Sequence, residues 1–250
     1  MRNKCNTRLL QIHSVDHCNY SCLECSHAAP VAQKRFYSYK EYQPHLEKLS
    51  EYVSVKVVTL TGGEAFLNKN LLQLAQGVRS SGVLSKSSIL QIDSNGFWLR
   101  DWEKHVEILE NIDLLRITRH PEQTIPEKEV DEILNQIGKK YCRTFNEDPP
   151  ERFAKVIFYD DPVPRKKCKF CLQLTADGYV SKCHLIPYPH KNTTKSFDDL
   201  KHEGLYDIHF GNVDSFERWH TVLHPCCDFC GFLNGRDKGI PHESSKDLKS

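Results

Sequence analysis

Three cysteines in one short loop constrain this chain more than any other feature. Cys18, Cys22 and Cys25 follow the spacing C-x-x-x-C-x-x-C directly after the apolar stretch 9–15. A loop this short can bring three thiolates to one side, where they can hold three irons of a [4Fe–4S] cube. Such a cluster normally takes four cysteines, so this loop leaves one iron without a protein ligand. An open metal position is typical of a catalytic site, whereas a structural site closes it.

The same loop permits a second interpretation. Cys18, Cys22, Cys25 and His27 have the composition of a four-ligand zinc site, because cysteine and histidine both bind zinc. Such a site would be closed, and its role would be structural. The loop alone leaves both interpretations open, and the remainder of the chain favours the iron–sulfur cluster.

The composition is that of a globular protein with a balanced charge. The 250 residues include 39% hydrophobic and 27% charged residues, and the formal net charge is +1. This balance provides no field that would recruit nucleic acid or an anionic membrane. No apolar run approaches the ~20 residues of a membrane span, and the first residues lack the apolar segment of a secretory signal. Eleven cysteines without an export signal indicate metal ligation in a reducing compartment, so we expect a cytoplasmic protein.

Segments with strand character alternate with amphipathic segments from residue 9 to about residue 160. The expected strands cover 9–15, 53–60, 88–93, 114–118, 140–146 and 153–159. One expected helix begins after the N-cap Ser38. Three further helices are expected at 71–78, 102–109 and 126–137. This alternation predicts βα units, and therefore an α/β fold with a parallel sheet.

Two glycines and a glutamate, Gly62-Gly63-Glu64, follow the second expected strand. A glycine has no Cβ, so it lets backbone groups approach a ligand closely. A carboxylate accepts hydrogen bonds from an ammonium group. In this position, after the cysteine loop and one helix, the motif is a candidate ligand contact.

In these two stretches the sequence resembles the radical S-adenosylmethionine enzymes. The resemblance rests on the three cysteines and the Gly-Gly-Glu motif, although Glu24 stands where the family more often has an aromatic residue. It implies that the three cysteines hold a catalytic [4Fe–4S] cluster, whose open iron is chelated by the amino and carboxylate groups of S-adenosylmethionine. It further implies that a 5′-deoxyadenosyl radical removes a hydrogen from the substrate. For Glu64 it implies contact with the methionyl amino group.

Polar residues also lie at the carboxyl ends of later expected strands. The active face of parallel α/β barrels is built from these ends. Ser94, Asn95 and Thr118 are therefore candidate ribose or carboxylate contacts for S-adenosylmethionine. The candidate substrate contacts are Arg119, His120 and Tyr159.

Six further cysteines crowd into the last third of the chain. A C-x-x-C comes first, an Asp-Gly hairpin signal and a single cysteine follow, and another C-x-x-C completes the set. Four thiolates at this spacing satisfy either zinc or a second [4Fe–4S] cluster. The pattern resembles the twitch and SPASM auxiliary-cluster domains of radical enzymes, which implies one auxiliary [4Fe–4S] cluster. The implied ligands are Cys171, Cys183, Cys227 and Cys230, with Cys168 as the competitor of Cys171.

The change in character near residue 160 predicts two domains and a tail. We expect residues 1–160 to form a partial (β/α)6 TIM-like barrel, as the resemblance implies. Residues 161–235 would form a small cysteine-rich, twitch-like domain with a β-hairpin, and residues 236–250 a polar tail. The Pro-containing stretch 161–164 is the expected connector.

These expectations lead to one principal function and two alternatives. The C-terminal segment resembles that of 2-deoxy-scyllo-inosamine dehydrogenases, which implies oxidation or epimerisation of a small polar molecule such as a sugar, cyclitol or nucleoside. An electron donor such as flavodoxin or ferredoxin would be a partner. One alternative is modification of a ribosomally made peptide, although a first strand that begins by residue 9 leaves no room for a leader-binding domain before it. The other alternative is a non-catalytic zinc or iron–sulfur scaffold.

Overall fold

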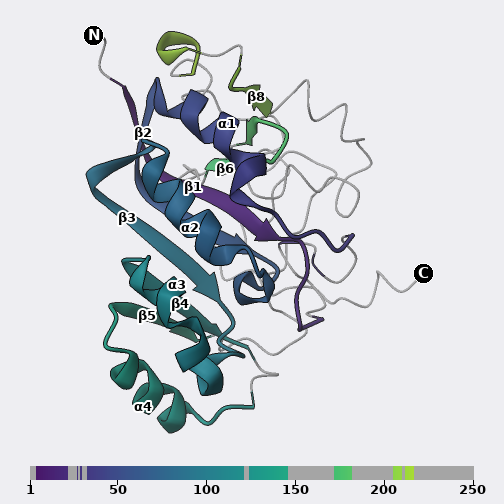
Figure 1. Ribbon diagram of the computed structural model, residues 1–250, viewed down its shortest axis with the longest axis vertical. Coiled ribbons are helices and arrows are strands. Elements are labelled where there is room, and N and C mark those ends of the chain that lie inside the picture. The colour runs from purple at the N-terminus through teal and green to yellow at the C-terminus, as the bar shows by residue number, and fades with distance from the viewer. Residues whose placement is uncertain are drawn as a thin grey trace, which may run out of the picture.

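The computed structural model describes residues 4–21, 27, 29, 33–120, 124–145, 172–181, 205–209 and 212–216 (Figure 1). For residues 119, 142–145 and 205–207 the description covers the backbone alone. The strands are β1 (Cys5–Val15), β2 (Val53–Gly62), β3 (Leu84–Ser94), β4 (Leu114–Arg119), β5 (Tyr141–Phe145), β6 (Leu172–Leu174), β7 (Tyr179–Ser181) and β8 (Leu205–Asp207). The helices are α1 (Tyr39–Ser50), α2 (Leu71–Ser80), α3 (Val106–Glu110) and α4 (Glu127–Ile137), with 3₁₀-helices η1 (Ala65–Leu67) and η2 (Leu99–His105).

The strands form one eight-stranded sheet in the order β5-β4-β3-β2-β1-β6-β7-β8. Strands β1 to β5 are parallel, as the alternation of segments predicted, and β6 is parallel to β1 on its other side. Strands β7 and β8 continue the sheet in antiparallel pairing. The α/β fold class is therefore confirmed. Since the parallel strands run in one direction, their carboxyl ends lie along one edge of the sheet.

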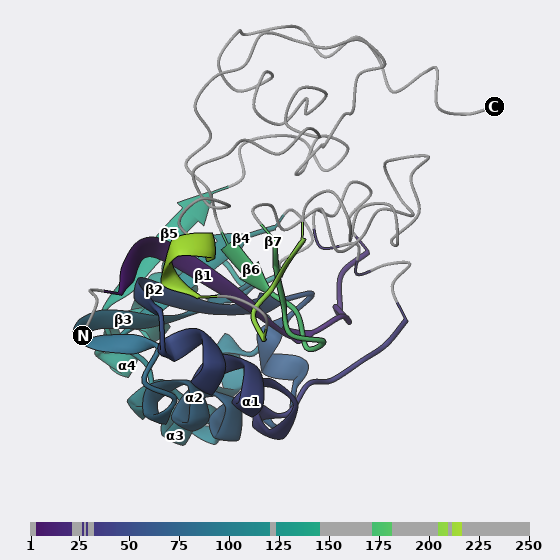
Figure 2. The same ribbon diagram turned by 90° about the horizontal axis from the view of Figure 1, so that it is seen from above.

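The two faces of this sheet differ in polarity, because successive side chains of a strand point to opposite faces. One face carries the buried aliphatic residues Leu10, Ile12, Val58, Leu60, Leu90, Ile92, Leu115 and Ile117. Helices α1 to α4 lie on one side of the sheet in Figure 2, and their buried residues belong to the same hydrophobic core. The other face carries polar side chains such as Gln11 and Thr59, which are also buried. The apolar face thus forms the hydrophobic core, whereas the opposite face buries polar side chains.

The predicted Asp-Gly hairpin is present, and it occupies an unexpected place. Strands β6 and β7 pair around it, with Gly178 at φ +84°, a left-handed conformation that glycine adopts readily. The sequence analysis assigned this hairpin to the cysteine-rich domain. In the structure β6 pairs with β1 through Leu10–Leu172, Gln11–Gln173 and Ile12–Leu174. The hairpin therefore extends the sheet that carries the first cysteine loop.

Helix α1 begins where the sequence predicts. Ser38 is its N-cap residue, and the Glu41 carboxylate accepts from both the backbone N–H of Ser38 (2.7 Å) and its hydroxyl (3.0 Å). Helix α4 follows Pro126, and Gly138 caps its carboxyl end in a left-handed conformation with a φ of +64°. Polar groups at the first turn and a left-handed glycine after the last turn satisfy backbone groups that a helix end leaves unpaired.

The helix predicted over 102–109 is wrong in its extent. The chain forms η2 first, and Asp101 leaves helical geometry with φ −113° and ψ 27° before α3 begins at Val106. The cause lies just upstream, where Trp98 stacks on Phe66 with ring centroids 3.9 Å apart and donates from Nε1 to Ser94 Oγ (2.8 Å). The His105 ring packs edge-on against both rings, at 5.2 Å from Phe66 and 5.3 Å from Trp98, and His105 itself leaves helical geometry with φ −116° and ψ 10°, which separates η2 from α3.

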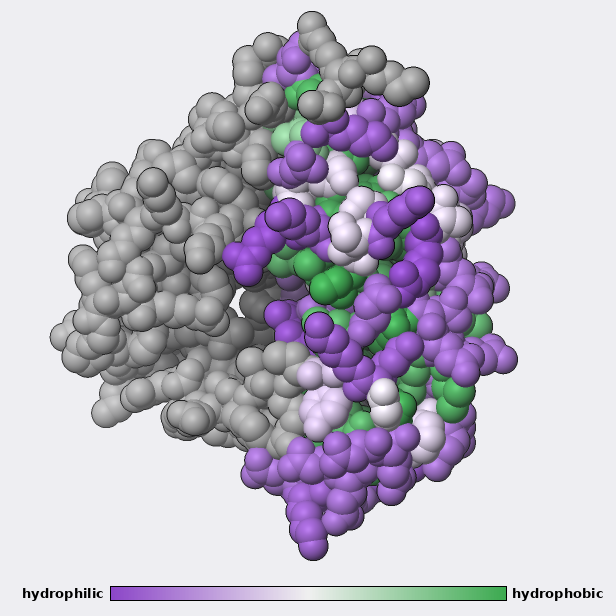
Figure 3. Space-filling view, turned by 90° about the vertical axis from the view of Figure 1, so that its left-hand side faces the viewer, coloured by the Kyte–Doolittle hydropathy of each residue, from purple (hydrophilic) through white to green (hydrophobic). Residues whose placement is uncertain are grey.

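The described surface is mainly hydrophilic on the face drawn in Figure 3, with small hydrophobic areas between polar ones. The large hydrophobic residues exposed among the described ones are Phe36, Phe97 and Val106. None of the helices in the described part of the chain has the length and apolar character that crossing a bilayer requires.

Candidate functional site

The cysteine loop begins at the carboxyl end of β1 and packs against the Gly-Gly-Glu segment. The backbone N–H of Gly63 donates to the carbonyl of Val15 (2.9 Å), and that of Glu64 donates to the carbonyl of His17 (2.9 Å). A Cβ at Gly62 would collide with the carbonyl of Val15, and one at Gly63 with that of His17. Gly62 also has a φ of +140°. The sequence analysis explained these glycines by the approach of a ligand, whereas the close approach in the structure is to the protein backbone just before Cys18.

Glu64 is fully buried and connects three segments of the site. Its carboxylate accepts from the Ser94 hydroxyl (2.9 Å), from the backbone N–H of Asn95 (2.6 Å) and from that of Phe66 (3.1 Å). Burial raises the pKa of Glu64 to about 7, against the opposing effect of these hydrogen bonds. A carboxyl group that titrates near neutrality therefore stands at the carboxyl edge of β2 and β3.

Asn95 links the end of β3 to the first cysteine. Its side-chain Nδ2 lies 2.9 Å from Asn19 Oδ1 and 3.7 Å from Cys18 Sγ. The backbone N–H of Tyr20 also donates to Cys18 Sγ (3.4 Å), and Asn95 Oδ1 accepts from the backbone N–H of Phe97 (3.0 Å). Two N–H groups thus point to one sulfur, an environment that stabilises a thiolate.

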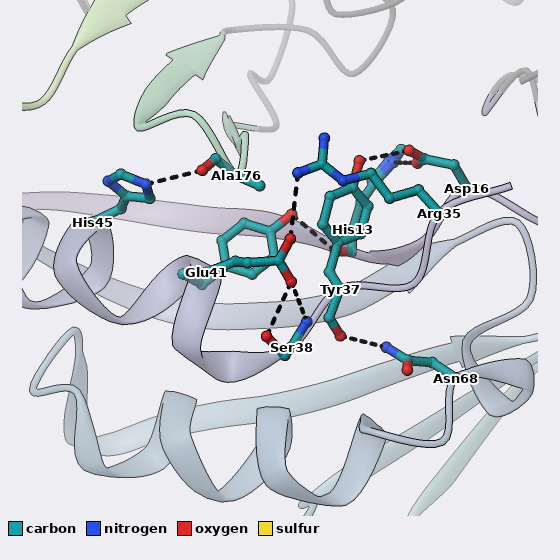
Figure 4. Close-up of polar contacts among 10 residues, drawn as sticks. His13, Asp16, Arg35, Tyr37, Ser38, Glu41, His45, Asn68 and Ala176 are labelled. Atoms are coloured by element: carbon teal, nitrogen blue, oxygen red, sulfur yellow. Dashed lines mark hydrogen bonds and ion pairs between the residues drawn. The ribbon is translucent and has the colours of Figure 1, made fainter. Parts of the chain in front are cut away.

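A buried polar chain holds the other side of the loop (Figure 4). His13 Nδ1 lies 3.2 Å from Asp16 Oδ1, and the Tyr37 hydroxyl donates to Asp16 Oδ2 (2.5 Å). His13 Nε2 lies 3.2 Å from Nδ1 of His27 in the cysteine loop. The Arg35 guanidinium covers the Tyr37 ring at 4.6 Å, and burial together with the hydrogen bond to Asp16 raises the pKa of Tyr37. Sequence reasoning missed this chain, because only the fold brings residues from 13 to 37 together.

The predicted site residues fall into three groups. Thr118 and Arg119 end β4, where Thr118 pairs with Thr144 of β5, and the His120 ring lies 5.5 Å from the Tyr20 ring. Gly62, Gly63, Glu64, Ser94, Asn95 and Cys18 are brought together, as described above. The predicted residues outside the described part of the chain are Cys22, Cys25, Tyr159, Cys168, Cys171, Cys183, Cys227 and Cys230.

A family model shows which kind of cofactor the chain holds. The model described as 4Fe-4S single cluster domain matches residues 7–143, more than half of the 250 residues. The chain belongs to this family. The matched region contains Cys18, Cys22 and Cys25, so the predicted [4Fe–4S] cofactor is confirmed for the chain. The zinc interpretation of the first loop is not supported.

Known structures resemble this 4Fe-4S family member in fold. BtrN in complex with AdoMet and 2-DOIA aligns with a TM-score of 0.56 and 16% identity, over 92% of this chain and 94% of that chain. Streptococcus suis SuiB bound to S-adenosylmethionine aligns with a TM-score of 0.39 and 11% identity, over 98% of this chain and 71% of that chain. A search of curated proteins finds no match. At this identity the likeness to BtrN concerns the fold alone.

The described residues fit one corner of an iron–sulfur cluster. Cys18 belongs to no disulfide, is partly exposed, and has the N–H groups of Tyr20 and Asn95 directed at its sulfur. Hydrogen bonds of this kind are common at cluster thiolates, where they influence the reduction potential. Among the described residues no three His, Cys, Asp or Glu side chains form a metal-binding group, since the other two cysteines of the loop lie outside them.

Proposed function

We propose that this chain is a radical S-adenosylmethionine enzyme. The observation that supports the proposal is the junction of Cys18, the Gly-Gly-Glu segment and Asn95 at the carboxyl edge of a parallel sheet. Membership of the 4Fe-4S family and the fold shared with BtrN, whose structure holds AdoMet, agree with it. In such a site, Cys18, Cys22 and Cys25 would hold three irons and leave the fourth for S-adenosylmethionine. When bound and reduced, such a cluster would supply the electron that cleaves the sulfonium.

The residues around Cys18 would then bind and orient S-adenosylmethionine. Glu64, with its pKa raised to about 7 by burial, would accept from the methionyl ammonium, whose positive charge favours the carboxylate form. Gly62 and Gly63 would keep the backbone of this segment close to the loop. Ser94, Asn95 and Thr118 would contact the ribose or the carboxylate.

For the substrate we propose a small polar molecule, oxidised or epimerised after hydrogen abstraction. The fold is similar to that of BtrN, whose structure also contains 2-DOIA. Arg119, His120 and Tyr159 are the proposed substrate contacts. The His120 ring lies 5.5 Å from the Tyr20 ring of the cysteine loop and is tilted to it by 51°, which supports its assignment as a substrate contact.

The division of the chain into domains is also part of the proposal. Residues 1–160 would form a partial (β/α)6 barrel, residues 161–235 a twitch-like domain with one auxiliary [4Fe–4S] cluster, and residues 236–250 a tail. The auxiliary ligands would be Cys171, Cys183, Cys227 and Cys230, or Cys168 in place of Cys171. We propose a cytoplasmic enzyme that receives its electron from a flavodoxin or ferredoxin.

The test is a cleavage assay on anaerobically reconstituted, reduced protein. The wild-type chain should convert S-adenosylmethionine to 5′-deoxyadenosine, and Cys22→Ala should abolish the conversion. Cys227→Ala should remove about half of the iron, on the basis of two clusters with four irons each, and spare the first cluster. A wild-type chain that binds iron at the first loop and forms no 5′-deoxyadenosine would rule out the proposed function.

A further inference from the structure

A row of polar side chains crosses the sheet on the face opposite to the hydrophobic core. The strand register places Gln173 of β6 beside Gln11 of β1, Gln11 beside Thr59 of β2, and Thr59 beside Gln91 of β3. Side chains at the same register of neighbouring strands point to the same face. All four are buried, with exposed fractions of 2%, 8%, 1% and 7% respectively. We call these four residues the polar row.

Three members of the polar row each have a side-chain oxygen without a hydrogen-bond partner in the described structure. The unpartnered atoms are Gln11 Oε1, Thr59 Oγ1 and Gln173 Oε1, on three adjacent strands. Native proteins leave few buried polar groups unpaired, because each one loses its hydrogen bonds to water on folding. Among the described residues the fourth unpartnered buried atom, Arg116 Nε, belongs to the same face, since Arg116 is beside Asp93 in register. Such a concentration on one face points to a bound molecule.

The polar row lies on the same sheet as the candidate site, further from the cysteine loop. Gln11 precedes His13 by two residues on β1, so it lies on the same face and about 7 Å further from the cysteine loop. Adjacent strands are about 4.8 Å apart, so the unpartnered atoms of three strands span about 10 Å. This width suits a six-membered ring with its substituents.

The charge of the face excludes several kinds of ligand. Gln11, Thr59 and Gln173 are neutral, and among the described residues Asp93 and Arg116 on this face form an ion pair with each other. The Gln91 amide donates to Asp93 Oδ1 (2.6 Å), which satisfies that carboxylate further. A phosphate or carboxylate would compete with Asp93 for Arg116, whose Nε is the unpartnered cationic donor of this face, and an apolar ligand would leave the glutamine oxygens unpaired.

We infer that the polar row is the substrate-binding floor of the enzyme and takes a neutral molecule with hydroxyl groups on successive carbons. A hydroxyl both donates and accepts, so one polyol can satisfy the two glutamine oxygens and the threonine hydroxyl together. The inference rests on the proposed function only in calling the bound molecule the substrate. Binding itself requires neither the cluster nor S-adenosylmethionine cleavage.

The first test compares two glutamines of the row that differ in their partners. In Gln11→Leu an amide whose oxygen is unpartnered is replaced by an apolar side chain of similar size, so the melting temperature should stay unchanged or rise. In Gln91→Leu the partly buried Asp93 loses a donor, and the melting temperature should fall by about 3 °C or more. Both variants are made in the full-length, anaerobically reconstituted chain. A Gln11→Leu chain that melts as low as Gln91→Leu, or fails to fold, would contradict the inference.

The second test measures binding of two matched probes by equilibrium dialysis. We expect wild-type protein to bind myo-inositol, which has six hydroxyls, more tightly than cyclohexanol, which has one. Gln11→Leu and Gln173→Leu should each weaken myo-inositol binding about fivefold, the value of one hydrogen bond. Gln43→Leu, the same substitution on the exposed side of α1, should leave binding unchanged.

Three results of the dialysis would overturn the inference. These are no binding of myo-inositol to wild-type protein, tighter binding of cyclohexanol, or unchanged binding in both row variants. Preferential binding of an apolar peptide in the same assay would count against it as well. Failure of the proposed function is recognised separately, because it appears as missing 5′-deoxyadenosine in the wild-type chain whatever the dialysis shows.

Discussion

The contact between Asn95 and Cys18 is the most informative one at the level of single residues. Asn95 is fixed by its backbone N–H to Glu64 Oε2 and by its Oδ1 to the Phe97 N–H, so its Nδ2 is held toward the cysteine sulfur. A donor held in place by other bonds loses little conformational entropy when it binds a thiolate. Asn95 is therefore a positioning residue for Cys18, the proposed first cluster ligand, in addition to its proposed role beside S-adenosylmethionine.

Replacing Asn95 by leucine should lower the reduction potential of the first cluster. The oxidised cluster carries less negative charge than the reduced one, so an N–H donor at its sulfur favours reduction. A hydrogen bond of about 1 kcal/mol corresponds to about 40 mV for one electron, which is the largest shift we expect. The measurement is a redox titration followed by EPR, with Gln43→Leu as the surface control. An unchanged or higher reduction potential in Asn95→Leu would show that the Asn95 side chain does not donate to the Cys18 sulfur of the cluster.

Glu64 makes stability depend on pH in a direction that can be worked out. Burial raises its pKa to about 7 in the folded chain, above the ordinary value of 4.5. The folded state therefore holds this proton more tightly than the unfolded state, and its stabilising effect is complete below pH 4.5. The effect is lost as the pH rises through about 7. Glu64 thus destabilises the cofactor-free fold at alkaline pH.

Glu64→Gln should remove this dependence. Its free energy of unfolding relative to wild type should improve by about 3 kcal/mol between about pH 5 and about pH 8. A constant offset is also expected, because the amide NH₂ cannot accept from the backbone N–H of Asn95. Urea unfolding of the cofactor-free chain over this pH range provides the measurement, and Glu107→Gln on the exposed side of α3 gives the baseline. A difference independent of pH would show that Glu64 does not titrate as described.

At the scale of elements, the carboxyl ends of β1 and β2 are held together by contacts between their backbones. Gly62 and Gly63 lie so close to Val15 and His17 that a methyl group has no space at either position. The polar chain of His13, Asp16 and Tyr37 holds the same loop from its other side. The first cysteine is therefore fixed between two strand ends.

Gly63→Ala should disturb this junction. The added Cβ collides with the backbone carbonyl of His17, which cannot move without moving Cys18, so we expect a loss of about 3 kcal/mol or more. Gly82→Ala is the control: Gly82 has a φ of +79°, its nearest atom is Ser50 Oγ at 3.5 Å, and about 1–2 kcal/mol should be lost. Urea unfolding and iron content after reconstitution measure both variants. A Gly63→Ala chain that is as stable as wild type would show that the loop is not held this way.

Local pattern determined most of the elements, and contacts between elements determined the rest. Strand and helix periodicity predicted β1 to β5, α1, α2 and α4 because these elements bury one regular face. It failed at 102–109, where the stacking of Trp98 on Phe66 redirects the chain. Nor can periodicity give the partner of a three-residue strand, so the pairing of β6 with β1 was not foreseen.

At the scale of the whole molecule, the sheet divides the protein into two parts with different tasks. The helices and the apolar face form the core, while the opposite face carries the polar row, and the carboxyl edge carries Cys18. The sequence showed the motifs of that edge because their residues are close together in the chain. The polar row depends on the register of four strands, which a single sequence does not show. The account therefore depends most on the cysteine loop and its cofactor.

The most direct test of that dependence is the EPR spectrum of the reduced first cluster with and without S-adenosylmethionine, recorded on Cys227→Ala protein to exclude an auxiliary signal. A cluster with an open iron should bind S-adenosylmethionine directly, so its spectrum should change on addition, and Glu64→Gln should require a higher concentration for the same change. A spectrum that S-adenosylmethionine leaves unaltered at saturating concentration would mean that no open iron exists there, and would contradict the account.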